Sequence, residues 1–209
     1  LLGPNGAGKT TTLRVLAGLM SPTLGSVHIA GIDVHQRPLE ARRALGFLTA
    51  STGLYDRLTG RELMTTFARL NGLEGERLQA RVTQTIDELQ LSAFVDKRCG
   101  TLSSGQKQRI GIARAIVHDP LLYVLDEPTA TLDPVASVDI LNLVQRAKRA
   151  GRAVVYCTHR MEEAQYLCSR LVFMNGGSIV AEGSPDTLLQ QSGRSSLTDA
   201  FLHYAGALA

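Results

Sequence analysis

The feature that most constrains this chain is a glycine-rich stretch at residues 3–10, which reads Gly-Pro-Asn-Gly-Ala-Gly-Lys-Thr. It matches the whole pattern G-x-x-x-x-G-K-[ST] of a phosphate-binding loop. Glycines let backbone N–H groups turn inward around phosphate oxygens, and the lysine adds a positive charge for the β and γ phosphates. Leu13, Leu16 and Ala17 follow at helical spacing, so the loop opens a helix whose N-terminus favours an anion. The pattern predicts a strand–loop–helix unit that binds a nucleoside triphosphate.

The predicted nucleotide-binding residues form one continuous run: Gly3, Pro4, Asn5, Gly6, Ala7, Gly8, Lys9, Thr10 and Thr11. The hydroxyl of Thr10 is the predicted ligand for a Mg²⁺ ion that bridges the phosphates. A phosphate-binding loop needs a buried strand that leads into it, and only Leu1 and Leu2 precede Gly3. We therefore expect this chain to be a fragment that lacks the first residues of its domain.

Composition narrows the class of protein further. A chain of 209 residues can form one α/β domain with a sizeable core. The net charge is +3 and the basic residues are scattered, so we predict no nucleic-acid-binding surface. Cys99, Cys157 and Cys168 show no metal-ligand spacing, which indicates buried thiols. No apolar run approaches the roughly 20 residues that span a bilayer.

Short apolar runs alternate with helical patterns along the chain. The predicted strands are Ser26–Ala30, Leu45–Thr49, Leu121–Leu125, Ala153–Cys157, Leu171–Met174 and Ser178–Ala181, with turns at 31–33 and 175–177. The predicted helical segments are 59–118, 140–147, Pro185–Gln191 and Leu197–Tyr204. This order predicts an α/β fold of the P-loop NTPase type, with a parallel-rich sheet flanked by helices and an inserted helical lobe. We expect a single domain over 1–209, in which 1–50 and 119–209 form the nucleotide-binding core and 51–118 the helical lobe.

Two adjacent carboxylates end one of the apolar strands. Asp126 and Glu127 directly follow the run 121–125, and side chains next to each other on a strand end point in different directions. We predict that Asp126 is a second Mg²⁺ ligand. Glu127 would orient or deprotonate the attacking water.

A second candidate site precedes the helical pattern of 110–117. Ser103 or Ser104 is a plausible N-cap, and the free N–H groups of the first turn could meet an anion. On the pattern alone, an ordinary capped helix start is the preferred interpretation of this segment. His159 likewise follows a strand, where a histidine is more often a polar cap than a catalytic group.

Taken together, these motifs resemble those of ATP-binding-cassette (ABC) ATPases. The segment Leu102-Ser-Ser-Gly-Gln-Lys-Gln-Arg-Ile-Gly-Ile-Ala-Arg-Ala-Ile is similar to the signature segment of that family. The segments 126–129 (Asp-Glu-Pro-Thr) and 132–134 (Leu-Asp-Pro) resemble its Walker B and D-loop region. The tail Ser178-Ile-Val-Ala-Glu-Gly-Ser-Pro resembles its closing hairpin. Segments 51–59 and 159–164 look most like bacterial exporter subunits, including the sodium-extruding type.

The resemblance implies a head-to-tail dimer that holds two ATP molecules with Mg²⁺ at its interface. Each nucleotide would lie between residues 3–11 of one copy and the trans-site residues Ser103, Ser104, Gly105 and Gln106 of the other. By the same resemblance, Glu127 and His159 are catalytic and Asp133 is the D-loop aspartate that joins the two sites. The implied function is ATP hydrolysis coupled to export through a transmembrane permease, at the cytoplasmic face of the cell membrane.

The chain departs from the family pattern at three places. Ala50 stands where a metal-contacting glutamine is usual, and Ser104 stands where glycine is usual. The aromatic residue that stacks on adenine would lie upstream of Leu1. An alternative function is a soluble ABC-type ATPase of translation or DNA repair, although the coiled-coil insertions and zinc cysteines of such proteins are absent from this sequence. A small-molecule phosphate-loop kinase would leave 102–106 and His159 unexplained.

Overall fold

The computed structural model of the protein describes residues 1–49 and 53–207. Its α-helices are α1 (Lys9–Leu16), α2 (Pro38–Arg43), α3 (Gly60–Leu70), α4 (Gly75–Glu88), α5 (Ser104–Ile116), α6 (Pro134–Arg149), α7 (Met161–Leu167), α8 (Pro185–Ser192) and α9 (Leu197–Tyr204). Its strands are β1 (His28–Ile29), β2 (Ile32–Asp33), β3 (Leu45–Leu48), β4 (Leu122–Asp126), β5 (Ala153–Cys157), β6 (Leu171–Asn175) and β7 (Ser178–Gly183). Within these ranges, no helix is long and apolar enough to cross a bilayer.

The centre of the molecule is a parallel sheet in the order β3-β4-β5. Val124 of β4 pairs with Phe47 of β3 on one side and with Val155 of β5 on the other. Leu2 extends this arrangement, because it forms parallel bridges to Thr158 after β5 and to Phe173 in β6. The hairpin β6–β7 is antiparallel. The predicted α/β class with a parallel-rich sheet is confirmed.

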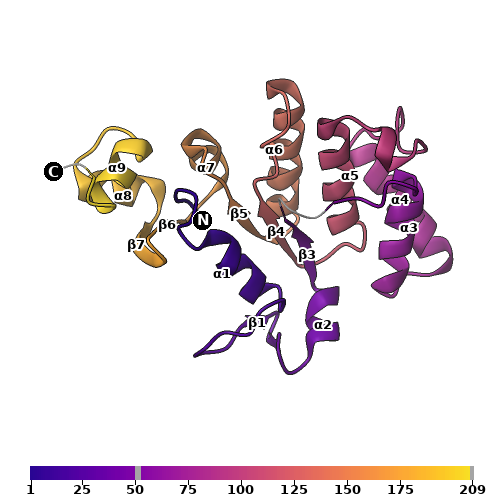
Figure 1. The fold of residues 1–209 in the computed structure, drawn as a ribbon, viewed down its shortest axis with the longest axis horizontal. Helices are drawn as coiled ribbons and strands as arrows, with labels where there is room; N and C mark the ends of the chain where they lie inside the picture. The colour runs from indigo at the N-terminus through magenta and orange to yellow at the C-terminus, as the bar shows by residue number, and fades with distance from the viewer. Residues whose placement is uncertain (50–52, 208–209) are drawn as a thin grey trace.

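Helices cover both faces of this sheet (Figure 1). Successive residues of a strand point to opposite faces, and in β4 the side chains of Tyr123 and Leu125 pack into the core shared with α5 and α6, whereas Val124 packs into the core beneath α1. Helices α3, α4 and α5 lie together at one end of the molecule, and α8 and α9 lie at the other. The apolar runs that predicted buried strands therefore serve two hydrophobic cores at once.

The described helices of the predicted lobe share a core with the sheet. Ile110 and Ile116 of α5 belong to the same buried cluster as Leu48 of β3 and Leu125 of β4. The division of the chain at residues 50 and 118 stays a prediction. Residues 50–52 lie outside the described residues. They include Ala50, which stands where the family usually has a metal-contacting glutamine.

The turn between β1 and β2 lies at other residues than the sequence predicted. The turn predicted at 31–33 is wrong, since Ile32 pairs with Ile29 and begins β2. Ala30 and Gly31 have φ values of 51° and 77° and form the two-residue connection with positive φ that suits a twisted hairpin. Helices α2 and α7 are short and were not predicted, because 6 and 7 residues carry too few turns to show a clear helical period.

Candidate active site

The phosphate-binding loop lies between the strand position of Leu2 and the start of α1. Gly8 is the N-cap of α1 and has a φ of 96°, a left-handed conformation that glycine adopts without steric cost. Gly3 approaches the neighbouring strand closely, because a Cβ there would lie 2.3 Å from the carbonyl oxygen of Met174. The first turn of α1 therefore begins at Lys9, with its N–H groups directed toward the loop. The structure confirms the predicted strand–loop–helix unit.

Lys9 is buried inside this loop, with 7% of its surface exposed. Its Nζ donates to the carbonyl oxygens of Gly3 at 2.6 Å and Pro4 at 3.0 Å. An ammonium group has three donors, so one N–H remains for an anion in the loop. The side chain thus both braces the loop and brings a positive charge to its centre.

Two oxygen-bearing side chains meet beside the loop. Thr10 Oγ1 donates to Asp126 Oδ2 at 3.3 Å, and Asp126 is 3% exposed at the carboxyl end of β4. A hydroxyl and a carboxylate are suitable ligands for Mg²⁺, which usually takes one or two protein oxygens and completes its shell with phosphate and water. Burial, followed by the neighbouring charge of Asp126, raises the pKa of the Cys157 thiol to about 12, so Cys157 stays neutral behind this pair.

Glu127 and His159 face each other at the carboxyl ends of β4 and β5. His159 Nδ1 lies 2.9 Å from Glu127 Oε1. The Glu127 side chain is 17% exposed and that of His159 is 63% exposed. The other carboxylate oxygen of Glu127, Oε2, is buried and has no hydrogen-bond partner among the described residues. Glu127 also has a φ of 49°, and a non-glycine residue held in this conformation costs of order 1–3 kcal/mol, a strain typical of active sites.

Ser103 caps the N-terminus of α5. Its Oγ accepts from Gln106 N at 3.2 Å, while Gln106 Oε1 accepts from Ser103 N at 3.1 Å, a complete capping box. Ser104 is the first residue of the helix and is not among the non-glycine residues with positive φ. Serine therefore fits at this position without the backbone strain that its departure from the family pattern could cause. Both serines are exposed.

The capped end of α5 is remote from the phosphate-binding loop of the same chain. In Figure 1, β4 and α6 lie between α1 and α5. Among residues 1–49 and 53–207, no hydrogen bond or ion pair links Ser103–Gln106 to the loop at 3–11. Nearby, Asp133 is the N-cap of α6, and its carboxylate accepts from Ala136 N at 2.9 Å. The predicted residues thus fall into two groups: the loop, Asp126, Glu127 and His159 in one, and Ser103–Gln106 in the other.

Four further polar residues lie behind the first group and were not predicted from the sequence. Glu163 of α7 is buried and contacts Thr129, Tyr156 and Arg160. Their sequence signals were weak. Thr129, Arg160 and Glu163 fall inside segments singled out for their likeness to the family, but nothing in the spacing showed that Thr129 and Glu163 would meet.

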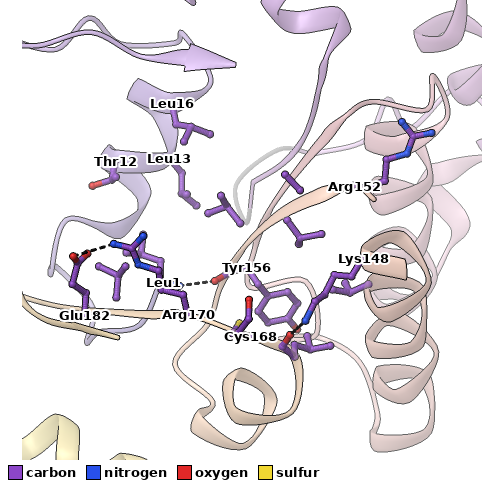
Figure 2. Close-up of a pocket in the computed structure, with 17 residues that line it drawn as sticks. Leu1, Thr12, Leu13, Leu16, Lys148, Arg152, Tyr156, Cys168, Arg170 and Glu182 are labelled. Carbon is purple, nitrogen blue, oxygen red and sulfur yellow. Dashed lines mark hydrogen bonds and ion pairs between the residues drawn. The ribbon is translucent and has the colours of Figure 1, made fainter. Parts of the chain in front are cut away.

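A cavity of about 530 Å³ lies along β5 and is lined also by residues of α1 and α6, as Figure 2 shows. Its cationic side chains already have partners. Arg170 pairs with Glu182 at 3.0 Å and Arg152 with Asp119 at 2.6 Å, and Lys148 donates to the Leu167 carbonyl oxygen. Its remaining lining is largely apolar, so it lacks the free donors of a phosphate site.

Comparison with known proteins shows the family to which this phosphate-binding site belongs. The family described as "ABC transporter" matches residues 1–130. The chain is 34% identical to the ABC transporter ATP-binding protein NatA of Bacillus subtilis (strain 168), over 97% of this chain and 82% of that protein. The chain belongs to the ABC transporter ATP-binding family. It is also 40% identical to the Nod factor export ATP-binding protein I of Burkholderia pseudomallei (strain 1710b), over 91% of this chain and 62% of that relative.

Solved structures agree. An ATP-binding subunit of an ABC transporter superposes with a TM-score of 0.90 at 30% identity, covering 97% of this chain and 85% of the other. A bacterial ABC transporter cassette in a dimeric structure gives a TM-score of 0.80 at 27% identity, covering 88% and 83%. The same values hold for a dimeric post-hydrolysis state of a cassette bound to ADP and Pi. The chain is therefore an ABC ATPase.

Proposed function

We propose that this chain is the ATP-hydrolysing subunit of an ABC exporter, and that two copies complete each other's active sites. The observation that carries the proposal is the separation of the two groups of predicted residues. The loop with Asp126, Glu127 and His159 forms a half-site, and the capped end of α5 offers a second anion-binding surface elsewhere on the molecule.

In the nucleotide half-site, residues 3–11 hold the triphosphate of ATP. Lys9 supplies charge to the β and γ phosphates, and the first turn of α1 supplies backbone donors. Thr10 and Asp126 would hold Mg²⁺, which would neutralise part of the phosphate charge. The contact of 3.3 Å between these side chains supports this pairing.

Hydrolysis in this proposal is an in-line displacement at the γ phosphorus. The water oxygen forms the new bond to phosphorus while the bond to the β–γ bridging oxygen breaks, so the products are ADP and inorganic phosphate. Glu127 Oε2, which is buried and has no hydrogen-bond partner in the described part of the chain, accepts the proton that the water loses. His159 holds the other oxygen of Glu127 and, from its exposed position, contacts the γ phosphate.

The second copy closes the site. Ser103–Gln106 of that copy would meet the γ phosphate with the hydroxyl of Ser103 and the N–H groups of the first turn of α5. Asp133 would join the two sites across the interface. The dimeric state of a similar cassette supports this arrangement.

A transmembrane permease is the proposed partner, with the chain at the cytoplasmic face of the membrane. A cavity of about 280 Å³ between the end of α1, β3, α3 and α5 fits the apolar side of a helix from that permease. Phe47 and Phe67 line it, and the Arg114 guanidinium lies 5.2 Å from the centre of the Phe67 ring. Burial lowers the pKa of Arg114, but its high starting value keeps it charged.

Glu127→Gln tests the catalytic assignment. The amide keeps the size of the side chain but cannot take a proton, so ATP binding persists and the hydrolysis rate falls about 10²–10⁴-fold. The measurements are binding of a fluorescent ATP analogue and single-turnover hydrolysis of radiolabelled ATP. An unchanged hydrolysis rate would refute the role of Glu127.

A further inference from the structure

Glu163 is a buried carboxylate that accepts hydrogen bonds from Thr129 and Tyr156 and forms an ion pair with Arg160, the N-cap residue of its own helix. It lies in the first turn of α7 and is 5% exposed. Thr129 Oγ1 lies 2.8 and 2.9 Å from its two oxygens, and Tyr156 OH donates to Oε2 at 2.8 Å. Arg160 Nη1 completes the set at 2.7 Å from Oε1. We define Glu163, Thr129, Tyr156 and Arg160 as the carboxylate cluster.

The three donors belong to the segments that carry the candidate catalytic groups. Thr129 lies two residues after Glu127, in the turn that follows β4. Arg160 directly follows His159, and its backbone N–H donates to Thr158 Oγ1 at 3.0 Å. Tyr156 lies in β5, three residues before His159. A single carboxylate therefore ties the turn of Glu127 to the turn of His159.

Burial makes the ties of Thr129 and Tyr156 strong and hard to replace by water, whereas the Arg160 side chain is 43% exposed. Thr129 is 1% exposed and Tyr156 is 3% exposed. Burial raises the pKa of the Tyr156 phenol, so the phenol keeps its proton and remains a donor. Hydrogen bonds to a charged acceptor are shorter and stronger than neutral ones, and in a buried site a missing partner leaves a polar group unsatisfied.

We propose that Glu163 is a positioning residue for hydrolysis: it fixes the separation of Glu127 and His159 by anchoring both turns to α7. The proposal rests on the proposed roles of Glu127 and His159. It explains how Glu127 can be held in a left-handed backbone conformation beside a mostly exposed histidine. Without the anchor, the 2.9 Å contact between the two side chains is free to lengthen.

The test is steady-state ATP hydrolysis by the full chain carrying Glu163→Gln. The amide fits the same space but presents an N–H group to a cluster made of donors, so at least one tie is lost. Because small misplacements of catalytic groups lower turnover strongly, we expect kcat to fall about tenfold or more. ATP binding does not involve the cluster, so KM for ATP changes by less than about threefold. Glu162→Gln is the matched control. This substitution removes the same charge from the same helical turn, but the Glu162 side chain is exposed.

A second pair of variants separates positioning from general loss of stability. Thr129→Val removes the hydroxyl at nearly constant volume, whereas Thr129→Ser keeps it. We expect Thr129→Val to lower kcat and Thr129→Ser to restore most of it, with rates normalised to the fraction of protein that binds a fluorescent ATP analogue. This pair decides the question even if Glu163→Gln folds poorly.

Measuring Glu127→Gln in the same series distinguishes failure of the positioning role from failure of the proposed active site. Loss of kcat in Glu127→Gln, Glu163→Gln and Thr129→Val, with normal rates in Glu162→Gln and Thr129→Ser, supports the proposal. A normal kcat in Thr129→Val and Glu163→Gln, with Glu127→Gln inactive, overturns the positioning role and leaves the proposed active site standing. Full activity of Glu127→Gln refutes the active site and the positioning role together. An equal loss of kcat and of nucleotide-binding capacity in Thr129→Val reduces Glu163 to a purely structural residue and also overturns the proposal.

Discussion

Ser103→Ala separates the two roles assigned to the capping serine of α5. Within one copy, the side chain makes one cap hydrogen bond, to Gln106 N at 3.2 Å. Loss of such a cap costs about 1 kcal/mol of folding free energy. For a chain of this length, that change lowers Tm by about 2–4 °C.

In the dimer, the same hydroxyl would donate to a charged phosphate. A hydrogen bond to a charged group contributes about 1.5–3 kcal/mol, and a symmetric dimer contains two such contacts. Their loss amounts to roughly 3–6 kcal/mol, which weakens ATP-dependent dimerisation about 10²–10⁴-fold. The effect on association is therefore much larger than the effect on folding.

Ser184→Ala is the matched control for this experiment. Ser184 also caps a helix, since its Oγ accepts from Thr187 N at 3.1 Å, and it shares a further hydrogen bond of 2.7 Å with Thr187 Oγ1. Helix α8 lies at the opposite end of the molecule from α5 (Figure 1). Both variants are made in the hydrolysis-deficient Glu127→Gln background, and the dimer dissociation constant with ATP is measured by sedimentation velocity. We expect both variants to lower Tm, Ser184→Ala by at least as much as Ser103→Ala, and only Ser103→Ala to weaken the dimer. Equal dimer affinity in the two variants would refute the composite site.

Three further predictions address the loop, the thiols and the partner surface. Lys9→Ala weakens ATP binding about tenfold or more, because the lost charge acts on the bound ground state as well; isothermal titration calorimetry measures it, and unchanged affinity contradicts the role of Lys9. Burial raises the pKa of Cys99, Cys157 and Cys168. A thiol reagent at pH 8 therefore labels these cysteines slowly in the native protein and quickly in denaturant. Rapid labelling of the native protein would contradict the burial of the three thiols. Phe67→Asp lowers co-purification of the permease, whereas Leu70→Asp, on the exposed side of the same helix, does not; equal recovery argues against the groove of Phe67.

Much of the fold could be predicted from the sequence where one interaction dominates. The run Ala153–Cys157 is apolar because Val154 packs against one hydrophobic core and Val155 against the other, and its predicted bounds match the observed strand. Helix α9, with predicted bounds Leu197–Tyr204, begins at a serine cap and has the same bounds in the structure. The short elements β2, α2 and α7 were missed, because 2, 6 and 7 residues are too few to show a clear strand or helix period.

In the site as well, some residues could be predicted from the sequence and others could not. Residues 3–10 could be assigned from the sequence because a phosphate-binding loop is a local backbone structure with a fixed spacing. The contact of Glu127 with His159, 32 residues away, needs the parallel pairing of β4 and β5 before it can form. Glu163 gave little local signal, because its distant partner Thr129, 34 residues away, reaches it only when β4 and β5 pair in the folded sheet.

The central claim is that ATP joins two copies of this chain through the loop of one and the start of α5 of the other. Its most direct test is the molar mass of the Glu127→Gln protein, measured by multi-angle light scattering after gel filtration, with and without Mg-ATP. We expect a monomer without nucleotide and a doubling of mass with it. A protein that is saturated with ATP yet keeps the monomer mass at every concentration tested would contradict the account.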